Sequence, residues 1–186
     1  MGVDLPPLAL SVRQPWAWAI IEGGKDIENR SLPSIRAGKM DCRTICIHAA
    51  TGMRRSEYEW AVVKMQKTQT KVPRPDDLPR RAIIGVVDVV DIVNQSDSPW
   101  FGHTMGLVLS NPRAIDPVPC QGALGYFEWS EDGALADMLP WMRKWDRTSN
   151  PNTPGLFPDM APSFRSQPSQ PFLRTPDSQP KKGTAR

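Results

Sequence analysis

LALSVRQPWAWAIIEGGKDIENR, residues 8–30, is the densest stretch of structural signals in the chain. Its first five residues, Leu8–Val12, have the apolar composition of a short buried strand. Pro15 suits the first position of a helix, because the N–H that proline lacks would have no partner there. The apolar segment Trp16–Ile21 then predicts about two buried helical turns. The Gly23–Gly24 pair is typical of the end of such a helix.

Ionisable residues follow the glycine pair at once, and no other segment places so many charges close to two tryptophans. They are Lys25, Asp26, Glu28 and Arg30, with Arg13 and Gln14 just before the predicted helix. In a strand, Asp26, Glu28 and Arg30 would share one face. The set can bind phosphate through its cations, and a desolvated Lys25 can act as a general base or nucleophile. A structural salt bridge of Glu28 with Lys25 or Arg30 accounts for the same residues equally well.

The remaining pattern is rich in strands and poor in helices. Strands are predicted at Arg43–Ala50, Ala82–Val93, Met105–Ser110 and Ala123–Trp129, with Ala114–Val118 as a further pairing segment after a turn at Asn111–Pro112. Helices are predicted at Met53–Gln66 and Ala134–Trp145, and loops at Pro33–Lys39 and Lys67–Arg81. Gly85 is expected to mark a bulge or a close approach. Five or six strands with flanking short helices predict a mixed α+β fold built on a small barrel.

The composition excludes several classes of protein. With 39% hydrophobic and 23% charged residues the chain is typical of globular proteins, and it has neither a run of about 18 apolar residues nor a signal peptide. The three cysteines, Cys42, Cys46 and Cys120, form no CxxC pair, which argues against a disulfide framework and a zinc site. We therefore expect a cytoplasmic protein. The two histidines, His48 and His103, lie in no metal or protease motif, so no metal or cofactor is expected.

Charge and proline content divide the chain. Residues 13–81 carry 14 Lys+Arg and 8 Asp+Glu, a balance of +6, whereas residues 82–147 carry 4 and 9, a balance of −5. This asymmetry indicates either a basic face for nucleic acid or two halves that neutralise each other. Residues 148–186 hold 8 of the 20 prolines and few large apolar residues. We expect a folded domain over residues 1–147 and a disordered Pro-rich tail over residues 148–186.

The quoted stretch resembles the ASCH (activating signal cointegrator homology) domain, whose hallmark is GxKxxExR. This chain has GGKDIENR at residues 23–30, preceded by LSVRQPWA at residues 10–17. Further similarity lies in IHAA at residues 47–50, IGVVDVVD at residues 84–91, Ser98–Trp100, Asn111–Pro112 and Gly122. The resemblance covers roughly residues 8–130 and implies a PUA-like β-barrel related to RNA-binding domains.

The resemblance also implies a cleft between barrel and helix that binds nucleic acid, most simply RNA. Lys25, Glu28 and Arg30 would line it, and Arg13, Gln14 and Trp16 would form its opposite wall. Relatives of the cointegrator type carry a tryptophan where this chain has Leu32, so the stacking aromatic would have to be Trp100 or Trp18. His48, in a predicted strand, is either a packed residue or a further lining residue.

A hydrolase is the alternative. Some small ASCH proteins resemble amidohydrolases that act on N4-acetylcytidine through a Lys, a Thr and a Glu. Lys25 matches the Lys, but Glu28 occupies the position of the Thr. We therefore favour a nucleic-acid-binding module over a hydrolase acting on a modified nucleoside or on RNA with Lys25 as base and Glu28 or Asp88 assisting. A protein-interaction domain is the third class.

Overall fold

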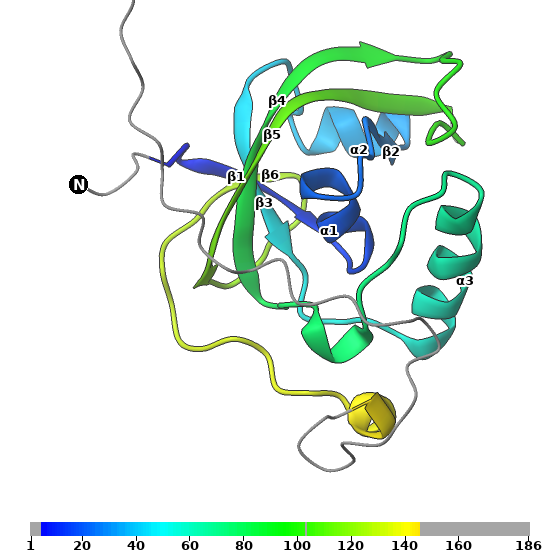
Figure 1. The fold of residues 1–186 in the computed structure, drawn as a ribbon. Coiled ribbons are helices and arrows are strands. Elements are labelled where there is room, and N and C mark those ends of the chain that lie inside the picture. The colour runs from blue at the N-terminus through cyan, green and yellow to red at the C-terminus, as the bar shows by residue number, and fades with distance from the viewer. Residues whose placement is uncertain (1–4, 103, 146–186) are drawn as a thin grey trace, which may run out of the picture.

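The structure is a computed structural model that describes residues 5–102 and 104–145. Six strands form one curled sheet in the order β2-β5-β4-β3-β1-β6 (Figure 1). They are β1 (Leu8–Val12), β2 (Ile27–Arg30), β3 (Thr44–Ala49), β4 (Ala82–Val93), β5 (Met105–Pro119) and β6 (Tyr126–Glu128). Within the described residues β2 and β6 are the two edges, so the sheet is a half-barrel. The predicted mixed α+β fold is confirmed at this level.

Strand pairing explains one error of the sequence prediction. β1 and β3 are parallel, and the other neighbouring strands are antiparallel. The turn predicted at Asn111–Pro112 is wrong, because β5 runs through it: Ser110 faces Asp88, Arg113 faces Val86, and two residues of β5 oppose one of β4. Such a β-bulge accommodates Pro112, which has no N–H for the ladder, and Asn111, which adopts a left-handed φ of 52°.

Three α-helices and two 3-10 segments accompany the sheet. They are α1 (Trp16–Ile21), α2 (Leu32–Ala37), α3 (Arg55–Gln66), η1 (Pro75–Asp77) and η2 (Pro140–Trp145). The loop predicted at Pro33–Lys39 is wrong: Ser31 caps α2 by accepting a hydrogen bond from the Ser34 N–H, and Pro33 fits the first turn. The helix predicted at Ala134–Trp145 is reduced to the short η2.

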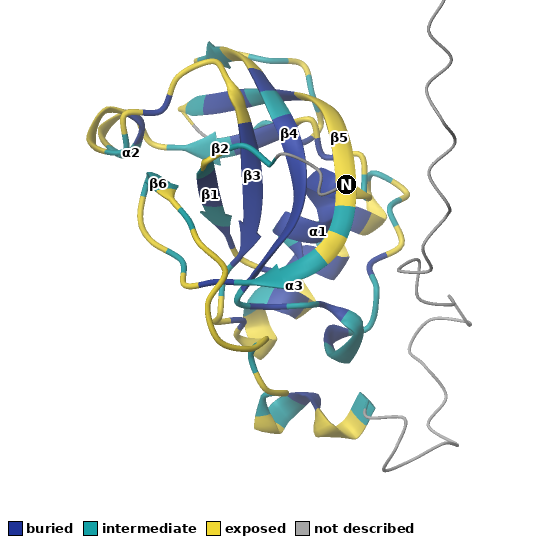
Figure 2. Ribbon diagram, turned by 90° about the vertical axis from the view of Figure 1, so that its left-hand side faces the viewer, coloured by how far each residue is buried: buried dark blue, intermediate teal, exposed yellow. Residues whose placement is uncertain are grey.

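Helix α1 is the centre of the fold (Figures 1 and 2). Ile20 and Ile21 pack against the sheet in one apolar cluster, and Trp18 and Ala19 pack against α3 in another. The predicted close approach at Gly85 is confirmed, since a Cβ there would lie 2.6 Å from Ile21 Cδ1. The sheet, α1 and α3 thus form three successive layers, and the chain passes from α1 into β2, an edge strand of the sheet (Figure 1).

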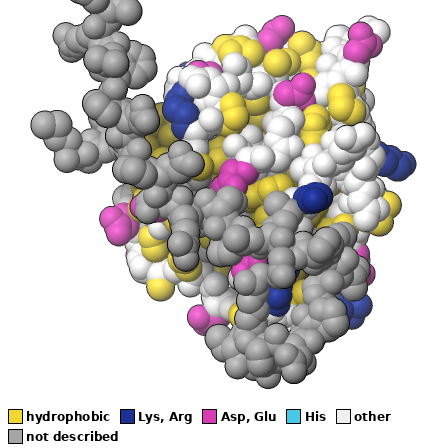
Figure 3. Space-filling model, in the orientation of Figure 1, with side chains coloured by type: hydrophobic (Ala, Val, Ile, Leu, Met, Phe, Trp, Pro, Cys, Tyr) yellow, Lys and Arg dark blue, Asp and Glu magenta, His cyan; other side chains and the backbone are white. Residues whose placement is uncertain are grey.

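Three further predictions concern the C-terminal tail, membrane-spanning segments and the distribution of charge. The tail at residues 148–186 lies outside the described residues, so the domain boundary stays a prediction. None of the helices in residues 5–102 and 104–145 has the length and hydrophobicity that a membrane-spanning helix requires. On the face shown in Figure 3, the basic and acidic side chains of these residues are interspersed.

Candidate functional site

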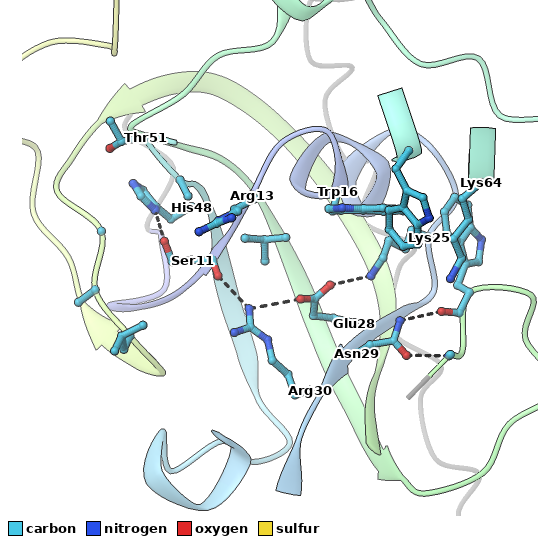
Figure 4. Close-up of a pocket in the computed structure, with 18 of the residues that line it drawn as sticks. Ser11, Arg13, Trp16, Lys25, Glu28, Asn29, Arg30, His48, Thr51 and Lys64 are labelled. Carbon is cyan, nitrogen blue, oxygen red and sulfur yellow. Dashed lines mark hydrogen bonds and ion pairs between the residues drawn. The ribbon is translucent and has the colours of Figure 1, made fainter. Parts of the chain in front are cut away.

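A cavity of about 770 Å³ opens beside β1, β2 and α3. Its volume lies in the range of about 300–1,000 Å³ that is typical of small-molecule sites. Its lining includes Ser11, Arg13, Trp16, Lys25, Glu28, Asn29, Arg30, His48, Trp60, Lys64, Trp100 and Gly122. Figure 4 shows Ser11 and His48 at one end, Trp16 and Lys64 at the other, and Glu28 between them.

The floor of the cavity is a buried chain of ion pairs. Lys25 Nζ lies 2.6 Å from Glu28 Oε2, and Arg30 Nη2 lies 3.2 Å from Glu28 Oε1. The side chains of Lys25 and Glu28 are only 4% and 10% exposed. Lys25 also donates to the Ile27 carbonyl, and Arg30 Nη2 donates to the Ser11 carbonyl at 2.8 Å. Each group of the trio therefore has a fixed orientation (Figure 4).

The local backbone explains this geometry. Gly24 has a φ of 71°, which glycine adopts without strain, and it turns the chain from α1 toward β2. The Lys25 N–H then bonds to the Ala19 carbonyl at 2.9 Å, which ties Lys25 to the end of α1. Glu28 and Arg30 share one face of β2, as the period of two predicts. Asp26 is exposed and accepts a hydrogen bond from Ser98 Oγ.

Burial and charge act in opposite directions on this trio. Burial lowers the pKa of Lys25 more than the neighbouring Glu28 carboxylate raises it. Burial also raises the pKa of Glu28, but the charges and hydrogen bonds of Lys25 and Arg30 outweigh that effect and lower it overall. Glu28 is therefore ionised at neutral pH. This carboxylate pairs with both basic groups of the floor, Lys25 and Arg30.

The wall contributed by α1 and α3 is aromatic and cationic. The ring centroids of Trp16 and Trp60 are 5.4 Å apart in an edge-to-face arrangement. Trp60 is 60% exposed, and Lys64 Nζ lies 5.6 Å from its ring centroid. Arg13 lies at the same wall, is 57% exposed and pairs with Glu57. The lining thus carries four cationic side chains and the single carboxylate of Glu28.

Most of the residues singled out in the sequence meet in this cavity. Arg13, Trp16, Lys25, Glu28, Arg30, His48 and Trp100 all line it. Gln14 does not, because it is fully buried: its Oε1 accepts from the Trp18 N–H and its Nε2 donates to the Pro79 carbonyl. Trp18 is packed in the core. Asp88 lies outside the lining, where Thr44 and Asn111 donate to its carboxylate.

The cavity also contains functional candidates that the sequence did not indicate. They are Ser11, Asn29, Trp60 and Lys64. Asn29 accepts from the Gly102 N–H and donates to the Trp100 carbonyl, so it fixes the loop that carries Trp100. One signal for Trp60 was available, since a tryptophan on the side of an amphipathic helix away from its apolar residues is unusual. Among the described residues, no group of His, Cys, Asp and Glu is placed to hold a metal ion.

Comparison with known proteins agrees with this architecture. The family model of the ASCH domain matches residues 10–138. Activating signal cointegrator 1 of Mus musculus is 34% identical over 91 residues, which cover 46% of this chain and 14% of that protein. The chain thus corresponds to a small part of this relative. The match of the family model over more than half of the sequence shows that the chain belongs to the ASCH domain family.

Proposed function

We propose that this ASCH domain binds single-stranded nucleic acid, and RNA in particular, in the cavity beside β2 and α3. The observation that carries the proposal is the composition of one lining: four cations, one carboxylate and an exposed tryptophan. Cations recognise phosphate, and aromatic rings stack on bases. The family adds support, since ASCH domains belong to the PUA-like superfamily, whose members generally bind RNA.

Phosphate recognition is assigned to the cations that are not neutralised. Glu28 offsets only one of the two charges of Lys25 and Arg30. Lys64 has no carboxylate partner among the described residues, and its ammonium group lies at the wall of the cavity. A phosphate between the floor and Lys64 would therefore complete the charge balance of the site.

Base stacking is assigned to Trp60. Leu32, at the position where cointegrator-type relatives carry a tryptophan, belongs to α2 and does not line the cavity. Trp100 lines it but is only 4% exposed, which leaves little of its ring for a ligand. Trp60 is exposed and packs edge to face with Trp16. Stacking of one base on such a ring contributes about 1–3 kcal/mol.

The shape of the site favours an unpaired strand. A cavity of about 770 Å³ has room for a splayed-out nucleotide but not for a double helix. Sequence-specific RNA recognition generally uses such unstacked bases. We also propose that the half-barrel sheet is of the PUA-like type and that the protein is cytoplasmic.

Fluorescence anisotropy with short labelled RNA and DNA oligonucleotides tests the proposal. The Trp60→Ala variant should weaken binding by about 1–3 kcal/mol, or roughly 5- to 150-fold. Val63→Ala is the matched control, because Val63 is an exposed apolar residue of α3 outside the cavity lining. Equal affinities of the two variants, or no binding of any oligonucleotide at low salt, would rule out the assignment.

A hydrolase that uses Lys25 as base toward a modified nucleoside is the second, weaker candidate. Its supporting observation is the burial that lowers the pKa of Lys25. The Lys25 ammonium already donates to Glu28 and to the Ile27 carbonyl, which ties it to a structural role. Incubation with N4-acetylcytidine, with Lys25→Ala as control, separates the two candidates.

A further inference from the structure

Ser11 and His48 form a hydrogen-bonded pair at the end of the cavity opposite to Trp60. They face each other in the register of the parallel strands β1 and β3. Ser11 Oγ lies 2.7 Å from His48 Nδ1, and both residues line the cavity (Figure 4). Nucleic-acid binding as proposed above uses neither side chain.

The surroundings of His48 fix which ring nitrogen carries the proton. Nε2 lies 3.3 Å from the Cys120 carbonyl oxygen. Because a carbonyl only accepts hydrogen bonds, Nε2 must be the donor and Nδ1 must be the acceptor for the Ser11 hydroxyl. Burial lowers the pKa of His48, so the ring is neutral at pH 7. This is the state in which histidine can take a proton from a hydroxyl group.

The Gly122 backbone packs closely against the pair, and His48 is only 1% exposed, so the cavity reaches the pair from the side of Ser11. A Cβ on Gly122 would lie 2.4 Å from His48 Cε1 and 2.9 Å from Ser11 Oγ, so any other residue would press against both groups. The Arg30 guanidinium lies beside Ser11, with Nη2 2.8 Å from the Ser11 carbonyl oxygen. A nucleophile beside a neutral base, with a cation nearby, is a combination of groups that acyl transfer uses.

We propose that Ser11 and His48 are a nucleophile and general base that hydrolyse an ester carried by an anionic ligand in the cavity. Ser11 Oγ attacks the carbonyl carbon, and its proton passes to His48 Nδ1. The C–O bond to the alcohol breaks, and the alcohol leaves with that proton. A water molecule then gives a proton to His48 Nδ1 and attacks the carbonyl carbon of the acyl group. The bond from this carbon to Ser11 Oγ breaks, the acid leaves, and the proton on His48 returns to Ser11 Oγ. The proposal relies on the proposed function only for the anionic character of the ligand.

Two probes test this activity on the full chain. A fluorophosphonate should form a covalent adduct on Ser11, located by mass spectrometry of peptides. p-Nitrophenyl hemisuccinate, an anionic ester, should be hydrolysed faster than neutral p-nitrophenyl acetate. Ser11→Ala should abolish the adduct and lower the hydrolysis rate by at least about 100-fold, the lower end for loss of a catalytic group.

Ser56→Ala is the matched control, since Ser56 is exposed on α3 and outside the cavity lining. It should retain both the adduct and the rate, and circular dichroism should show that both variants are folded. Absence of an adduct on Ser11, or equal rates for Ser11→Ala and the wild type, would overturn the inference. RNA binding is measured separately on the wild type, so a failure of the nucleic-acid proposal is distinguishable from a failure of this one.

Discussion

Replacing Glu28 with Gln should destabilise the domain far more than replacing a surface glutamate. Glu28 is the carboxylate between Lys25 and Arg30, and its side chain is 10% exposed. Removal of one partner from a buried ion pair typically destabilises a protein by about 3–5 kcal/mol, because a charge stays buried without compensation. The cavity admits water to Arg30, whose side chain is 21% exposed, so we expect the lower end, about 3 kcal/mol. In the melting temperature this corresponds to a decrease on the order of 10 °C.

Urea unfolding at pH 7 measures this difference. Glu59→Gln is the matched control, because Glu59 pairs with Arg55 four residues earlier on the exposed side of α3. Pairs of that kind contribute about 0.2–0.5 kcal/mol. Equal losses of unfolding free energy in the two variants would show that the ion pairs at the floor of the cavity stabilise the domain no more than an exposed pair does.

The pH dependence of the same variant is a second readout. The pKa of Glu28 is lowered from its ordinary 4.5, so its stabilising effect is complete above about pH 4.5 and is lost as the pH falls through the lower folded-state value. The wild type should therefore lose stability over this acidic range more steeply than Glu28→Gln. Parallel curves for the two proteins would contradict the assignment of Glu28 as the ionised member of the trio.

The other predictions concern His48, Gly122 and the cations of the cavity. Burial lowers the pKa of His48 from its ordinary 6.5. The contribution of the neutral ring to stability is therefore complete above about pH 6.5 and is lost as the pH falls through the folded-state pKa. Between pH 7.5 and 5.5, urea unfolding should show a smaller decrease in unfolding free energy for His48→Gln than for the wild type. Gly122→Ala should lower the unfolding free energy by about 1–3 kcal/mol through overpacking against His48, whereas Gly52→Ala, with open space around its Cβ, should not. Lys64→Gln should reduce the slope of log K for RNA against log salt by about one, and Lys67→Gln, outside the cavity lining, should leave it unchanged.

The sequence predicted the part of the site that depends on local periodicity. Glu28 and Arg30 are two residues apart in a strand, and the glycine pair before them forces a turn, so their common face follows from the chain itself. The pairing of this strand with β5 holds that face toward the cavity.

The positions of the other site residues depend on tertiary packing, which cannot be predicted from local sequence patterns. Trp60 and Lys64 reach the cavity only because α3 packs on α1 through Trp18, a contact between segments far apart in the sequence. Gln14 belongs to the same motif as Arg13, yet it turns inward to bond the Trp18 N–H. Ser11 meets His48 through a parallel pairing of β1 and β3 that alternation in either strand does not specify.

Photo-crosslinking shows directly whether RNA binds in the cavity beside β2 and α3. A 4-thiouridine-labelled RNA is irradiated with the full chain, and the modified residues are identified by mass spectrometry. If RNA binds in the cavity, the adducts should lie on Trp60 and on the loop at residues 121–124 that lines the opposite side. Adducts confined to the basic residues Lys181, Lys182 and Arg186, or to the outer face of β4 and β5, would show that RNA does not bind in the cavity.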